Sequence, residues 1–198
     1  NMPFLRLFLL PVTLFYGIFV YIRNLFFDLG VFSSKEYSVP IISVGNLCAG
    51  GSGKSPHVEY IINLIENKNK IAVLSRGYGR DTSGFKWVKS DSFVKDVGDE
   101  PLQIVRKFPE IRVAVSESRN VGIQNLIQDE CELIVLDDAF QHRWVKPGLN
   151  ILLTTYDNLF INDHLMPFGH LRESSKRASR ADIIVVTKSP HPLLPLDE

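Results

Sequence analysis

Short apolar runs alternate with longer amphipathic stretches over most of the chain after residue 38. The runs are rich in Val, Ile and Leu, and they predict buried strands at residues 39–44, 71–74, 111–115, 133–136, 151–154 and 183–186. The intervening stretches predict helices at 57–66, 101–107, 121–128 and 172–180. Because strands that alternate with helices form βαβ units, we expect an α/β fold with a mostly parallel sheet and helices on both faces.

The N-terminal region departs from this pattern. Residues 7–22 carry no charge and lie between Arg6 and Arg23. A helix of this length measures about 24 Å, which is shorter than the roughly 30 Å hydrocarbon core of a bilayer. The stretch is apolar on all sides, and Tyr16 and Tyr21 suit a membrane interface. We therefore predict a membrane-associated helix within residues 1–33, either spanning or lying on the bilayer. A buried core helix is the alternative.

The remaining residues, 34–198, are expected to form one nucleotide-binding domain. Within it, the polar stretch 82–96 contains Phe85 and Trp87 and predicts a short hairpin or flap. The 22 basic residues balance 22 acidic ones, so no overall field attracts nucleic acid, and we expect no nucleic-acid partner. The two cysteines, Cys48 and Cys131, are far apart and indicate a reducing compartment without a disulfide framework.

The most informative motif follows the first predicted strand and reads Gly50-Gly51-Ser52-Gly53-Lys54-Ser55. Glycines allow backbone N–H groups to surround a polyphosphate, and the helix that follows directs its positive end at the same anion. Lys54 is expected to reach the β- and γ-phosphates, and the Ser55 hydroxyl to bind Mg²⁺. The motif predicts a P-loop NTPase-like fold. The predicted nucleotide-binding residues are Cys48, Ala49, Gly50, Gly51, Ser52, Gly53, Lys54 and Ser55.

Two alternatives concern this loop. A glycine-rich turn without any ligand would have a similar composition, although the preceding strand and following helix favour a nucleotide site. Cys48 occupies the position where the P-loop consensus has its first glycine. A thiol beside a helix N-terminus can have a lowered pKa, so Cys48 is either a reactive thiol or a small buried side chain.

Four further motifs lie at or near the predicted C-terminal ends of strands, where ligands bind in such sheets. Arg76, Tyr78 and Arg80 follow the second strand within a glycine-rich turn that could hold phosphate. Asp99 precedes a helix and is either a capping residue or a general base. Paired carboxylates at Asp137 and Asp138 end an apolar strand and predict an Mg²⁺ site.

The last of these motifs contains Arg172 and Glu173. Either Arg172 or Arg119 could stabilise the charge of a transferred phosphoryl group. Glu173 could support Mg²⁺, and Gln141 and His142 continue the cluster that starts at the paired carboxylates.

Taken together, these motifs resemble the tetraacyldisaccharide 4′-kinases, the lipid A 4′-kinases of Gram-negative lipopolysaccharide synthesis. The matching stretches occur in the family's order over residues 39–188. The resemblance implies transfer of the ATP γ-phosphoryl group to the 4′-hydroxyl of an acylated glucosamine disaccharide 1-phosphate, with ATP and Mg²⁺. It implies the cytoplasmic face of the inner membrane, a lipid substrate in that membrane and Asp99 as the base. Substrate contacts are then expected from Arg76, Tyr78, Arg80, Gln141 and His142.

The resemblance also implies a second domain that supplies a histidine to the catalytic aspartate. No residue of this chain is assigned to that histidine, and residues 188–198 are expected to begin a linker. The rival functions are a membrane-attached nucleotide-dependent switch or GTPase and a nucleotide-binding scaffold without catalysis. Thr187-Lys188-Ser189 resembles a base-reading strand end only weakly. The sequence does not indicate a protein partner.

Overall fold

The computed structural model describes residues 9–65 and 70–190 of the chain. Within them, seven strands form one sheet in the order β3-β4-β2-β5-β1-β6-β7. All neighbouring strands are parallel except β3, which runs antiparallel to β4. The strands are β1 (Ile41–Asn46), β2 (Ile71–Ser75), β3 (Lys86–Val88), β4 (Arg112–Val115), β5 (Leu133–Asp137), β6 (Leu149–Thr155) and β7 (Ile183–Thr187).

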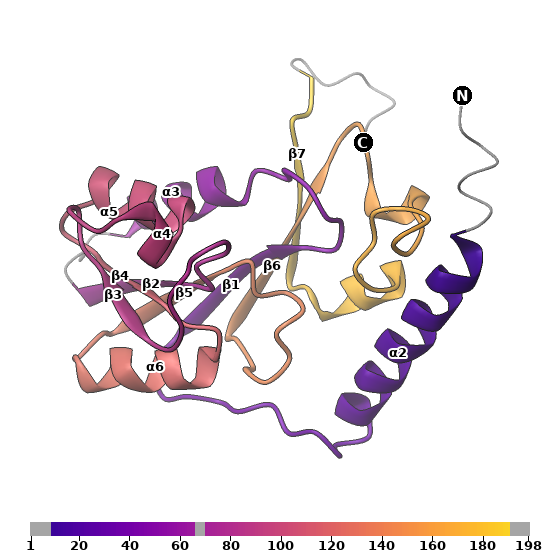
Figure 1. Ribbon diagram of the computed structural model, residues 1–198, viewed down its shortest axis with the longest axis horizontal. Helices are drawn as coiled ribbons and strands as arrows, with labels where there is room; N and C mark the ends of the chain where they lie inside the picture. Colours follow the sequence, from indigo (N-terminus) through magenta and orange to yellow (C-terminus); the bar gives the residue numbers. More distant parts are fainter. Residues whose placement is uncertain (1–8, 66–69, 191–198) are drawn as a thin grey trace.

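Helices cover both faces of this sheet, as the sequence predicts. Three lie on one side and α6 lies on the other (Figure 1). Their bounds are α3 (Lys54–Leu64), α4 (Val94–Val97), α5 (Asp99–Lys107) and α6 (Arg119–Gln128). Successive residues of the central strands therefore point alternately into two hydrophobic cores, one on each face of the sheet. The α/β prediction is confirmed, and all six predicted strands form.

The N-terminal helix α2 (Leu10–Asp28) stands beside the end of the sheet that carries β6 and β7 (Figure 1). It is long and apolar enough to cross a membrane, judged by length and composition. Its large apolar side chains are mostly exposed, with Phe15 exposed to 74% and Phe19 to 68%. Only Asn24 and Phe27 are buried, so the alternative of a buried core helix is wrong. The predicted start of this helix, at residues 7 and 8, lies outside the described residues.

Two predicted elements differ in the structure. Residues 172–180 do not form an α-helix, and only a short 3₁₀ helix, η3 (Ser175–Arg180), is present. The segment starts in an extended conformation instead, because Leu171 forms an antiparallel bridge with Cys48 and Arg172 N–H donates to the carbonyl of Leu47. The backbone is still extended at Ser174, with ψ 139°, so a helix cannot run through residues 172–180. The stretch 82–96 does not form a hairpin within itself. It contains β3, which pairs with the distant strand β4, followed by the start of α4. A second short 3₁₀ helix is η2 (Phe160–Asn162).

Candidate functional site

The glycine-rich loop joins β1 directly to α3. Gly53 has φ +82°, a left-handed conformation that favours glycine, and α3 starts at the next residue, Lys54. The helix therefore begins three residues earlier than the sequence suggested, with Pro56 in its first turn, where its missing N–H removes no helical hydrogen bond. Lys54 and Ser55 consequently lie at the helix N-terminus, where partial positive charge accumulates.

Side chains outside the glycine turn hold its carbonyl groups. Thr187 Oγ1 donates to the carbonyl of Ser52 at 3.0 Å, and Lys188 Nζ donates to that of Gly51 at 2.9 Å. Asn46 Nδ2, at the end of β1, donates to the carbonyl of Cys48 at 2.6 Å. The strand ends thus fix the path of the loop. A cavity of about 250 Å³ lies between the loop and the ends of β6 and β7.

A larger cavity, of about 790 Å³, opens beside Lys54. It collects most of the polar residues that the motifs single out, although these residues come from six separate parts of the chain. They are Lys54, Arg76, Tyr78, Asp99, Arg119, Asp138, Gln141, His142, Arg172 and Glu173. The sequence did not identify Ser75, Glu100 or Glu117 as lining residues. Four residues of α2 complete the wall, namely Tyr16, Phe19, Val20 and Arg23.

The paired carboxylates diverge at the end of β5. Asp137 is buried, accepts a hydrogen bond from Ser75 Oγ at 3.3 Å, and has no hydrogen-bond partner for Oδ1 within the described chain. Burial, with the neighbouring carboxylates of Glu100 and Asp138, raises the pKa of Asp137 to about 6. Asp138 has φ +48°, and this turn in the backbone places its carboxylate in the cavity. There it lies 3.8 Å from Lys54 Nζ and 3.0 Å from Arg172 Nη1.

Two glycines permit the close approach of the segments that form the site. A Cβ on Gly45 would lie 2.7 Å from the backbone and side chain of Phe140, so only glycine lets the loop after β5 lie against β1. Gly98 has φ +90°, and a Cβ there would lie 3.2 Å from the carbonyl of Tyr78. The turn that contains Gly98 and Asp99 therefore packs directly against the turn after β2.

Asp99 is the first residue of α5 rather than its N-cap, which is Gly98. Its carboxylate accepts a hydrogen bond from the backbone N–H of Glu100 and lines the cavity in an exposed position. The Ser55 hydroxyl donates to Glu100 Oε1 at 3.4 Å. Asp99, Glu100 and Ser55 are thus neighbours at the N-termini of α3 and α5.

The two candidate arginines have different environments. Arg172 is partly exposed in the cavity, as its 28% side-chain exposure indicates. Arg119 is buried and donates to the backbone carbonyls of Ser116 and Asp137, each at 2.8 Å. Burial lowers the pKa of Arg119 to about 10. The Nε atom of Arg119 has no hydrogen-bond partner within the described chain. Arg119 therefore holds the end of β5 through the backbone carbonyl of Asp137. Arg172, in contrast, faces the open part of the cavity.

Two predicted ligand residues are engaged elsewhere. Arg80 does not line the cavity: its buried side chain pairs with Glu117 and donates to the carbonyl of Gly84. Glu173 is 1% exposed, pairs with Arg180 and accepts a hydrogen bond from Asn24 Nδ2 at 3.2 Å. These contacts correct the expectation that Arg80 and Glu173 are free to meet a substrate or metal.

The described residues contain no group of three or more His, Cys, Asp or Glu side chains that could hold a metal. The donors that fit Mg²⁺ are oxygens on three residues: the Ser55 hydroxyl and the carboxylates of Asp137 and Asp138. The buried, unpartnered Oδ1 of Asp137 supports this fit, because such an atom costs free energy unless something meets it. This set suits a cation that also binds phosphate oxygens.

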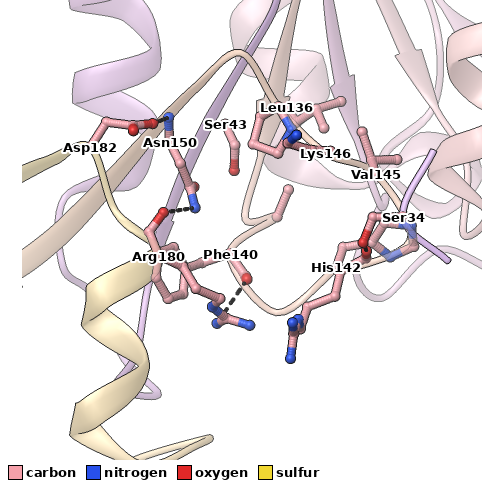
Figure 2. A pocket seen from close by; sticks show the side chains of 13 residues that line it. Ser34, Ser43, Leu136, Phe140, His142, Val145, Lys146, Asn150, Arg180 and Asp182 are labelled. Atoms are coloured by element: carbon pink, nitrogen blue, oxygen red, sulfur yellow. Dashed lines mark hydrogen bonds between the residues drawn. The ribbon is translucent and has the colours of Figure 1, made fainter. Parts of the chain in front are cut away.

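His142 lies between the large cavity and a third one of about 360 Å³. Figure 2 shows the third cavity, which is surrounded by Phe140, Asn150 and Arg180 as well as His142. Burial lowers the pKa of His142 to about 4, so its ring is neutral at pH 7. Its Nε2 has no hydrogen-bond partner in the described part of the chain. His142 Nε2 is therefore a buried polar atom without a partner among the described residues.

The surroundings of Cys48 argue against a reactive thiol. Burial and the nearby carboxylate of Asp163 raise the pKa of Cys48 to about 11. Cys48 is half-buried because the segment before Arg172 pairs with it: Ala49 N–H donates to the carbonyl of His170, and Cys48 forms a β-bridge with Leu171.

Comparison with known proteins agrees with this geometry. The family model described as tetraacyldisaccharide-1-P 4′-kinase matches residues 5–194. The tetraacyldisaccharide 4′-kinase of Bacteroides fragilis (strain YCH46) is 51% identical over 192 residues, covering 96% of this chain and 51% of that protein. The one from Flavobacterium psychrophilum is 50% identical over 191 residues, covering 96% and 56%.

A solved structure also resembles this chain. It is an "apo" form of LpxK from Aquifex aeolicus in complex with ATP, with a TM-score of 0.87 and 38% sequence identity. The similarity covers 93% of this chain and 59% of that one. The chain thus spans about half the length of the curated relatives it matches.

Proposed function

The chain belongs to the tetraacyldisaccharide 4′-kinase family, and on this premise we propose that it binds ATP and carries the phosphoryl-transfer site of a lipid-sugar kinase. The reaction proposed is transfer of the γ-phosphoryl group to the 4′-hydroxyl of an acylated glucosamine disaccharide 1-phosphate. One observation carries this proposal: Lys54, Asp138 and Asp99 line a single cavity that is walled on one side by the apolar helix α2. The cavity thus offers a phosphate end and a lipid side.

In this reaction, Lys54 and the N-terminus of α3 hold the β- and γ-phosphates. Asp99 is exposed in the cavity and accepts the proton of the sugar hydroxyl, or orients that hydroxyl for attack. Arg172 neutralises charge on the transferred group, and Arg119 holds the end of β5 in place. Phosphoryl transfer depends mainly on such positioning and electrostatics.

Mg²⁺ would be held by Ser55, Asp137 and Asp138 together with phosphate oxygens, and would neutralise charge on the phosphates. The base of ATP would occupy the smaller cavity between the phosphate loop and the ends of β6 and β7. That cavity is lined by Gly50, Gly51 and Lys188, and Lys188 Nζ donates to the carbonyl of Gly51. Arg76, Tyr78, Gln141 and His142 line the large cavity and are assigned to the sugar acceptor. Gln141 would exchange its hydrogen bonds with Arg172 and Asn46 for such a contact.

The exposed apolar side chains of α2 support membrane association. They adjoin the proposed acceptor side of the cavity, so a lipid-borne sugar could enter without leaving the bilayer surface. We place the protein at the cytoplasmic face of the inner membrane. Residues 1–33 form the membrane-associated region, 34–198 the kinase domain and 188–198 the start of a linker. Of these, 1–8 and 191–198 lie outside the described residues.

A transfer assay tests the proposal. The full-length protein is incubated in mixed micelles with an acylated disaccharide 1-phosphate and with ATP radiolabelled at the γ-phosphate. The assay is run with and without Mg²⁺. Label should move to the lipid, and an Asp99→Ala variant should transfer it much more slowly. If ATP binds and label never moves, the scaffold alternative holds. If GTP displaces ATP at equal concentration and no lipid is labelled, the switch alternative holds. The family assignment does not favour either rival.

A further inference from the structure

Two side chains on the face of α2 that lines the large cavity, here called its inner face, donate hydrogen bonds to backbone carbonyls of the candidate site. Tyr16 Oη donates to the backbone carbonyl of Arg172 at 2.7 Å, and Arg23 Nη2 donates to the backbone carbonyl of Gln141 at 2.8 Å. Tyr16 and Arg23 are seven residues apart, so they lie on the same face of the helix, two turns from each other. Both also line the large cavity.

The two residues that accept these bonds hold the phosphate end of the cavity together. Arg172 Nη1 contacts both carboxylate oxygens of Asp138 and lies 3.4 Å from Gln141 Oε1. Gln141 Nε2 in turn donates to the carbonyl of Asn46 at 2.6 Å, at the end of β1. A displacement of either carbonyl would therefore move a side chain that touches Asp138 or its partner.

The same helix is tied to this region at further points. Thr13 Oγ1 accepts a hydrogen bond from the backbone N–H of Phe168 at 3.2 Å, and Asn24 Nδ2 donates to Glu173. The segment that contains Phe168 and Arg172 also pairs with the phosphate loop, since Arg172 N–H donates to the carbonyl of Leu47 at 2.8 Å. A continuous set of hydrogen bonds thus joins α2 to the loop that is proposed to bind ATP.

We propose that Tyr16 and Arg23 are positioning residues: they fix Arg172 and Gln141, and through them the carboxylate of Asp138 relative to Lys54. This inference rests on the proposed function. It assigns α2 a second role in addition to membrane association. A simple anchor needs only apolar character on its outer face, whereas a positioning helix needs these two polar side chains on its inner face.

Tyr16→Phe and Arg23→Gln test this assignment in the full-length protein. Each should lower kcat for phosphoryl transfer roughly three- to tenfold, the factor that an ordinary hydrogen bond represents in a rate. The KM for the lipid substrate should stay within twofold of the value for the parent protein. The fraction of protein that binds to lipid vesicles should also stay within twofold of the parental fraction. Matched controls lose the same kind of bond elsewhere: Tyr37→Phe, which loses its bond to Asn120, and Arg106→Gln, which loses its bond to Ser90. These should retain the parental kcat.

A double-mutant cycle separates positioning from general loss of stability. In an Arg172→Ala background the carbonyl remains but there is no guanidinium to misplace, so adding Tyr16→Phe should have less than its single effect. Additive losses, or a kcat for Tyr16→Phe equal to that of Tyr37→Phe, would overturn the proposal.

The proposed function can fail separately from this inference. If the parent protein binds MgATP but transfers no phosphate, the cycle is run on the MgATP dissociation constant instead. Non-additive weakening by Tyr16→Phe and Arg172→Ala would then support the positioning role, and additive or absent weakening would refute it.

Discussion

Arg172 Nη1 lies 3.0 Å from both carboxylate oxygens of Asp138, and the same carboxylate lies 3.8 Å from Lys54 Nζ. Asp138 therefore sits between the two cations that are best placed to meet a polyphosphate. Because the side chains of Asp138 and Arg172 are about one third exposed, at 32% and 28%, an incoming anion can compete with Asp138 for Arg172. The side chain of Lys54 is 11% exposed. The arrangement keeps Lys54 and Arg172 close to the proposed phosphate position.

Removal of Arg172 should slow transfer strongly. Arg172→Ala should lower kcat about 10²- to 10³-fold, the loss typical for a group that stabilises charge in the transition state. Arg172→Lys should recover only part of this, because Nη1 contacts Asp138 and lysine lacks the further guanidinium nitrogens that can meet phosphate oxygens. Initial rates of label transfer measure both variants. Equal rates for Arg172→Ala and the parent would remove Arg172 from the reaction.

Lys54→Ala should abolish most of the activity. Without the ammonium group the phosphates lose their main side-chain contact, so transfer should fall by about two orders of magnitude or more and MgATP should bind more weakly. Lys146→Ala is the control, since Lys146 pairs with Glu36 on the surface. Calorimetric titration with MgATP and the transfer assay give the two readouts. Near-normal turnover of Lys54→Ala would contradict the assigned role of the loop.

Local patterns sufficed for most of the fold and for the phosphate loop. Buried parallel strands are nearly continuous apolar runs, so β1, β2, β5 and β6 could be read directly from the sequence. The loop was predictable because Gly53 and Lys54 occur between such a strand and a helix. Since parallel strands end at one edge of the sheet, most of the other motifs could be expected to meet there.

Contacts between distant segments explain what the sequence did not show. Arg80 resembled a phosphate ligand because its pairing with Glu117, 37 residues away, has no local signal. The helix expected at 172–180 does not form because the segment is extended up to Ser174, where Leu171 pairs with the distant Cys48. The tight contact at Gly45 also has no local signal, since nothing near Gly45 in the sequence identifies Phe140 as its neighbour.

Glu173 offers a test of a structural role against a metal-binding role. Its removal leaves the partly buried guanidinium of Arg180, 19% exposed, without its carboxylate partner, so Glu173→Ala should lower the free energy of unfolding by roughly 1–3 kcal/mol. Urea denaturation followed by circular dichroism measures the change. Glu36→Ala serves as the control, since it removes an exposed partner of Lys146 and should leave the midpoint in place. Unchanged stability of Glu173→Ala with a raised Mg²⁺ requirement would instead assign Glu173 to the metal.

Cys48 should react slowly with alkylating reagents, because only the thiolate is nucleophilic. With its pKa raised from 9.0 to about 11, the thiolate fraction at pH 8 is about 100-fold smaller than for an unperturbed thiol. Iodoacetamide labelling of a Cys131→Ala variant, followed by mass spectrometry from pH 7 to 10, measures this. The rate should rise about tenfold per pH unit over the whole range, since the upward shift moves ionisation beyond it. A rate that levels off below pH 8 would mean that the helix N-terminus lowers the pKa after all, and that the thiol is available for reaction beside the phosphate loop.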